Sequence, residues 1–152
     1  MRAKALEGTV VFVDISGFTK MSKRLARHGR VGAEEVTDVV GFVFRRLLAT
    51  AYANRGGLIK FGGDALLLWF AGEEHASDGV AAAIGMRQTL KQMGPIDTTA
   101  GKVRLRMSVG AHSGPFHFFL VGDRHRELLL NWGTILTDQQ IAQPVAYLNT
   151  LT

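Results

Sequence analysis

Two short apolar runs, each leading to an aspartate, constrain most strongly how this chain can fold. Residues 10–13 (VVFV) run directly into Asp14, and residues 58–61 (LIKF) are followed by two glycines and Asp64. β-Branched and aromatic residues in short runs predict buried strands. A carboxylate at the end of such a strand is held in place yet remains hydrated enough to ionise. Two such groups brought together form an oxygen-ligand site for a hard divalent cation that also binds phosphate, which predicts chemistry on a nucleotide.

Each of these residues also has a structural interpretation. Asp14 could cap the following helix, and Asp64 could occupy a hairpin turn. Lys60 precedes Asp64 by four positions, and regular pleating would place both on one face of the strand. There the lysine would either bind a base or phosphate, or pair with Asp64. Residues 16–19 (SGFT) open a predicted helix, whose unpaired backbone amides suit phosphate oxygens.

Periodicity and turn residues predict the order β-α-α-β-β-α-β-β-β-α. Hairpins alternating with helical crossovers predict an α+β fold with a mainly antiparallel sheet and helices on one face. The glycine pair before Asp64 predicts a tight hairpin, and residues 113–115 (SGP) predict a turn. The predicted strands are 9–14, 58–61, 65–71, 103–112, 116–121 and 127–132, and the predicted helices are 16–27, 32–52, 73–93 and one from residue 137.

Composition indicates one globular domain. The chain has 152 residues and 47% hydrophobic residues, enough for a core of its own. It has no cysteine, which excludes disulfides and thiolate metal sites and is compatible with a cytoplasmic location. No apolar run reaches the roughly 18 residues of a membrane span. The net charge of +5 is scattered along the chain, so we expect an anionic small-molecule partner and no nucleic acid.

Three segments together resemble a known family. Residues 12–19 (FVDISGFT), 59–65 (IKFGGDA) and 109–114 (VGAHSG) are similar, in order and spacing, to the signature segments of class III adenylyl/guanylyl cyclase catalytic domains of bacterial type. The resemblance covers residues 8–133. It implies a ferredoxin-like core, active sites at the interface of a homodimer or a heterodimer with another cyclase domain, and conversion of ATP to 3′,5′-cyclic AMP and pyrophosphate.

The resemblance also implies roles for individual residues. Asp14 and Asp64 match the two catalytic, metal-binding aspartates, which hold two Mg²⁺ or Mn²⁺ ions with the Ile15 carbonyl as a further ligand. Lys60 matches the lysine that selects adenine. The turn that wraps the triphosphate matches Ile15, Ser16, Gly17, Phe18 and Thr19.

Several positions depart from the family pattern. Leu130 stands where an aspartate usually helps to read adenine, which leaves base selection to Lys60 or the neighbouring Asn131. Ser108 stands where many members place a phosphate-binding arginine. Arg104 and Arg106, which we expect on one face of the same strand, could replace it. The usual ribose-positioning asparagine and transition-state arginine are replaced by Thr137 and Ile141.

These departures leave two hypotheses. Residues 1–152 form a single cyclase catalytic domain that lacks the usual C-terminal segment and acts as an adenylate cyclase, or they form an impaired nucleotide-binding, regulatory domain that dimerises with a complete one. Loss of one preorganised charge donor typically slows a reaction about 10²- to 10³-fold, so the second hypothesis is kept. The hairpin also resembles that of diguanylate cyclases, but Ala65 stands where that family needs an acid.

Overall fold

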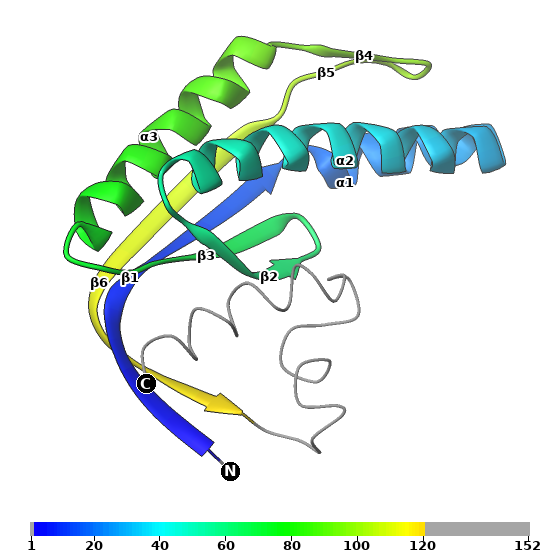
Figure 1. Ribbon diagram of the computed structural model, residues 1–152. Coiled ribbons are helices and arrows are strands. Elements are labelled where there is room, and N and C mark those ends of the chain that lie inside the picture. The colour runs from blue at the N-terminus through cyan, green and yellow to red at the C-terminus, as the bar shows by residue number, and fades with distance from the viewer. Residues whose placement is uncertain (1, 121–152) are drawn as a thin grey trace.

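A four-stranded antiparallel sheet with helices over one face forms the molecule (Figure 1). The structure, a computed structural model, describes residues 2–120, in which the strands lie in the order β2-β3-β1-β6. This confirms the predicted α+β class. The predicted strand at 127–132 and the helix from 137 lie outside the described residues. The elements are β1 (Arg2–Ser16), α1 (Phe18–Leu25), the 3₁₀ helix η1 (Ala26–His28), α2 (Gly29–Ala53), β2 (Gly57–Gly62), β3 (Ala65–Phe70), α3 (His75–Met93), β4 (Ile96–Thr98), β5 (Gly101–Val103) and β6 (Arg106–Leu120).

Strand β1 is buried on one face only. Val11, Val13 and Ile15 are fully buried against the helices, whereas Phe12 is 49% exposed and Asp14 is exposed. Residues 9–14 were predicted to form a buried strand with Asp14 hydrated at its end; burial holds on the helix-covered face, and the exposed Phe12 departs from the prediction. Because side chains alternate across a strand, a sheet with helices on one side leaves every second residue of β1 on an open face.

The helices form much as predicted. In α1 the buried residues are Phe18, Met21 and Leu25, the stripe expected from their spacing. Helix α2 begins a turn earlier than predicted, and α1 begins two residues later. Gly32 is required where α2 passes the end of α1, because a Cβ there would lie 1.9 Å from the Leu25 carbonyl oxygen.

The second half of the sheet differs from the prediction. Residues 113–115 form no turn: β6 runs through them, and Gly114 pairs with Gly8 of β1. Pro115 is tolerated because β6 is an edge strand within residues 2–120, where a missing backbone donor need not break a ladder. The predicted strand 103–112 begins only at Arg106, and the hairpin of β4 and β5 just before it was not predicted.

That hairpin is attached to α2 through one carboxylate. The amide and hydroxyl of Thr99 donate to Glu35, at 2.8 and 2.5 Å. These two hydrogen bonds stabilise the ionised carboxylate and lower the pKa of Glu35, the hydroxyl having the larger effect.

None of the helices in residues 2–120 is long and apolar enough to cross a membrane.

Attachment of the hairpin should depend on pH. With a lowered pKa, the contribution of Glu35 is complete above the ordinary value of 4.5 and is lost as pH falls through the folded-state pKa. We expect the Thr99 amide to be protected from hydrogen exchange above that range and to lose protection below it. The Glu35→Gln variant should show no such step, since its carbonyl oxygen accepts a hydrogen bond without titrating. A step of the same size in this variant would contradict the assignment.

A second polar contact joins the end of α2 to α3. Arg55, which has a positive φ of 63°, donates Nε to Asp78 Oδ2 at 2.8 Å, and its Nη2 bonds Oδ1. The Asp78 side chain is only 9% exposed, whereas that of Arg55 is 69% exposed. A carboxylate in such a position depends on its partner for charge compensation.

Removal of this contact should destabilise the domain. We expect Arg55→Ala to lower the free energy of unfolding by about 1–3 kcal/mol, because Asp78 is then left buried without its partner. Urea denaturation measures the loss. The control is Lys102→Ala, which breaks the exposed Lys102–Asp97 pair and should cost less than about 0.5 kcal/mol. Equal losses in the two variants would refute the structural role of Arg55.

Candidate functional site

The pairing of β1 with β3 brings Asp14 and Asp64 to neighbouring backbone positions. Asp14 stands opposite Ala65, and the amide of Ile15 donates to the carbonyl of Asp64 at 3.0 Å. Asp64 occupies the two-residue turn between β2 and β3 together with Gly63, whose φ is +69°. A positive φ at the first turn position is the glycine requirement of a tight hairpin. The two acidic residues thus lie at the same end of adjacent strands.

Both carboxylates are available for a ligand. Asp14 does not cap α1, since the N-cap is Gly17 and makes no side-chain capping bond. Asp64 is a turn residue, as its structural interpretation held, and is partly buried. Within residues 2–120 neither carboxylate has a hydrogen-bond or ion-pair partner, so the alternative of a Lys60–Asp64 pair is not observed. Oxygen donors of this kind suit a hard divalent cation.

Lys60 lies on the same open face of the sheet as Asp14. It stands opposite Leu67 of β3, which in turn pairs with Phe12 of β1. The exposed Lys60 faces away from the helices and follows a bulge between Leu58 and Lys60. Strand β2 ends at Gly62, so the regular pleating predicted from Lys60 to Asp64 stops at the turn. The exposed Phe12, part of the run predicted to form a buried strand, lies between Lys60 and Asp14 on this face. The one sequence signal for the exposure of Phe12 is its position two residues before Asp14, because alternate residues of a strand lie on the same face.

The segment after β1 is a sharp turn into α1. Ile15 is buried and Ser16 ends the strand. Gly17 has a φ of +114°, and a Cβ there would lie 3.0 Å from the Leu105 side chain and 3.1 Å from the Arg104 carbonyl oxygen. The Phe18 ring packs in the core, 5.7 Å from Phe44, while Thr19 is exposed. Phe18 can therefore contact a ligand through its backbone but not through its side chain. The first turn of α1 has no acidic residue, which favours an anionic ligand at this helix N-terminus.

Strand β6 completes this face. Ser108 stands opposite Asp14, and Arg106 stands opposite Ser16; both side chains are exposed. Arg104 precedes the strand, so the expectation that it shares a strand face with Arg106 was wrong. Of Arg104 and Arg106, it is therefore Arg106 that the pairing of β1 with β6 places near the candidate site.

The candidate metal ligands are few. In the part of the chain that the structure describes, no group of three or more His, Cys, Asp or Glu residues could hold a metal ion. The candidate is instead a pair of carboxylates, Asp14 and Asp64, next to the backbone of Ile15. Leu130, Asn131, Thr137 and Ile141 lie outside the described residues.

Comparison with known proteins decides the family. The profile of the adenylate and guanylate cyclase catalytic domain matches residues 3–137. The chain belongs to this family. It is 26% identical over 149 residues to adenylate cyclase type 10 of Rattus norvegicus, covering 96% of this chain and 9% of that protein. The human adenylate cyclase type 10 is 27% identical over 148 residues, with 94% and 9% coverage. The chain thus spans about a tenth of the length of these relatives.

Solved structures agree on the fold. The guanylyl cyclase domain of the RhoGC fusion protein from Blastocladiella emersonii aligns with a TM-score of 0.64 and 23% identity, covering 81% of this chain and 66% of that chain. The adenylyl cyclase CyaB from P. aeruginosa aligns with a TM-score of 0.62 and 23% identity, covering 83% and 65%. These structures confirm the cyclase fold. Because they include both adenylyl and guanylyl cyclases, the fold does not distinguish ATP from GTP as the substrate.

Proposed function

We propose that this domain is an adenylate cyclase, which converts ATP to 3′,5′-cyclic AMP and pyrophosphate with two divalent cations at a dimer interface. The observation that carries the proposal is the placement of Asp14 and Asp64 at adjacent positions of β1 and the β2–β3 turn, without partners in the described chain. Family membership supports cyclase chemistry, and Lys60 supports the choice of adenine.

The residues would divide the work as follows. Asp14 and Asp64, with the Ile15 carbonyl, would hold the Mg²⁺ or Mn²⁺ ions. When bound, these ions supply Lewis-acid activation of the ribose 3′-hydroxyl and neutralise charge on the pyrophosphate. Lys60 would donate to a ring nitrogen of adenine.

The triphosphate would be bound by the turn and by β6. The backbone amides of residues 16–19 would orient its oxygens, as helix N-termini commonly do for phosphates. Gly17 would let the backbone of the turn approach the triphosphate closely, because glycine has no side chain. Arg106, opposite Ser16, would add a positive charge.

The open sheet face supports a dimeric assembly. Phe12 is 49% exposed there, beside the candidate site. A second cyclase domain laid on this face would bury the ring and exclude water from the reacting atoms. The partner would be a second copy of this chain or another cyclase domain.

One observation favours the alternative of an impaired regulatory domain. Directly opposite Asp14 stands Ser108, a neutral residue, where the family resemblance implies an arginine. In that case the domain would bind nucleotide through Asp14, Asp64 and the turn, and turnover would depend on a complete partner.

Activity should depend on both aspartates. We expect purified protein with labelled ATP and Mn²⁺ to form cyclic AMP, and Asp14→Asn or Asp64→Asn to lower kcat/KM by at least about 100-fold, as loss of a principal electrostatic group typically does. Asp38→Asn on the exposed side of α2 is the matched control, with an expected change below about twofold.

Three outcomes separate the hypotheses. ATP binding without product at any protein concentration would favour the regulatory domain. Higher activity with GTP than with ATP would refute the role of Lys60. Undiminished activity in both aspartate variants would refute the site itself.

A further inference from the structure

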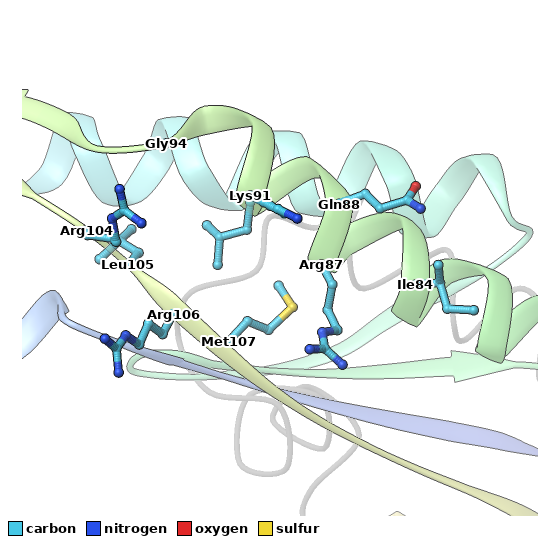
Figure 2. A pocket seen from close by; sticks show the side chains of 10 residues that line it. Ile84, Arg87, Gln88, Lys91, Gly94, Arg104, Leu105, Arg106 and Met107 are labelled. Carbon is cyan, nitrogen blue, oxygen red and sulfur yellow. The ribbon is translucent and has the colours of Figure 1, made fainter.

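A groove lies between α3 and the chain that leads into β6, and of its lining residues Arg106 alone has a proposed role in the cyclase site. Its volume is about 790 Å³, within the range of small-molecule sites. Figure 2 shows its two sides: α3 residues such as Arg87 and Lys91, and the segment from Arg104 to Met107. Arg87 extends from the helix toward the strand in this view.

The groove is basic on both sides. Arg87 and Lys91 come from α3, and Arg104 and Arg106 come from the opposite side. Among the described residues, none that lines the groove is acidic. Within residues 2–120 none of these four cations forms an ion pair. A nearby carboxylate would neutralise these positive charges, but the buried Asp78 carboxylate pairs with Arg55 and lies outside the groove.

This charge pattern is unfavourable for the fold alone. Arg87 and Lys91 are four residues apart on one helix, where like charges repel, and only Lys91, in the last turn, gains a favourable interaction with the helix dipole. Arg104 and Arg106 add two further positive charges across the groove. Charges that break a local rule without a structural partner are typical of functional sites.

The floor of the groove is apolar. Leu90 and Leu105 are each 7% exposed, and Met107 packs against the core. Ile84, at one end, is 53% exposed. The lining therefore suits a ligand with an anionic part and an apolar or planar part.

We propose that this groove binds a phosphate-bearing ligand of nucleotide size, separately from the Asp14–Asp64 site. The groove differs from that site in Arg87 and Lys91, which belong to α3 on the helix-covered side of the sheet, whereas Asp14 is exposed on the other face. Arg106, on the edge strand β6, borders both sites. Guanidinium and ammonium groups from two elements recognise phosphate through charge-assisted hydrogen bonds. The proposal does not depend on cyclase activity.

The test compares two double variants that each remove two positive charges. Arg87→Gln/Lys91→Gln alters the groove without touching Arg106, and Arg45→Gln/Arg46→Gln alters exposed positions of α2 away from it. Inorganic triphosphate is titrated into the full chain by calorimetry, in EDTA so that divalent cations do not support binding at the aspartates. We expect the groove variant to lose about tenfold or more in affinity for triphosphate and the control less than about twofold. Direct hydrogen bonds to a charged group are strong, whereas the attraction of distant exposed charges is screened by salt.

A second arm identifies the source of the phosphate. Sedimentation with phosphatidylserine vesicles, against phosphatidylcholine vesicles, shows whether the groove takes a lipid headgroup. Groove-dependent binding of either probe supports the proposal. Binding of neither probe by the unmodified chain, or equal losses in the two double variants, overturns it.

A labelling measurement covers the case in which the groove variant does not fold. Acylation of lysines in the unmodified chain, read by mass spectrometry, should be slowed at Lys91 by the bound probe and unchanged at Lys23 of α1. Equal labelling of Lys91 with and without the probe overturns the proposal.

Discussion

The antiparallel pairing of β1 with β3 determines both the core and the candidate site. From Thr9 opposite Phe70 to Asp14 opposite Ala65, this register places Val11 and Val13 beside Leu68 and Leu66 on the helix-covered face. The same register places Asp14 on the open face next to the Asp64 turn. A slip of one residue would exchange the two faces, expose the core side chains and bury the carboxylate. The hydrophobic effect that fixes the core therefore also positions the acidic residues.

Among residues 2–120 the helices cover only one face of the sheet, and this asymmetry determines where the candidate site lies. On the open face Lys60 of β2, Phe12 and Asp14 of β1, and Arg106 of β6 are exposed. On the covered side, the edge of β6 and α3 frame a groove with basic side chains. The Arg55–Asp78 contact and the Glu35–Thr99 contact attach the helices and the β4–β5 hairpin to this frame.

The sequence predicted local structure well wherever one short-range pattern was sufficient. The buried stripe of α1 and the hairpin around Gly63 followed from periodicity and turn residues, whereas the nearness of Asp14 to Asp64 was implied by the family resemblance. The prediction failed where a long-range partner decided the outcome. Residues 113–115 read as a turn, but pairing with the first half of β1 holds them in a strand. Phe12 belongs to a run that was predicted to be a buried strand, but no described element covers its side chain, which is 49% exposed. The β4–β5 hairpin has only three residues per strand and depends on Glu35, far away in the sequence.

The site itself was predicted as a set of residue types and not as a geometry. The position of Arg106 opposite Ser16, and the separation of Arg104 from the strand, required the register of β6. The roles of Leu130, Thr137 and Ile141 remain predictions because these residues lie beyond the described part of the chain.

A double-mutant cycle on Mn²⁺ affinity tests the shared carboxylate site most directly. Electron paramagnetic resonance would measure Mn²⁺ binding, in the presence of a non-hydrolysable ATP analogue, to the unmodified protein, Asp14→Asn, Asp64→Asn and the double variant. If both carboxylates hold the same ions, the double variant should lose little more affinity than either single variant, since residues with common partners are not additive. Independent losses that sum in the double variant would show that the two aspartates serve different sites, and would contradict the account.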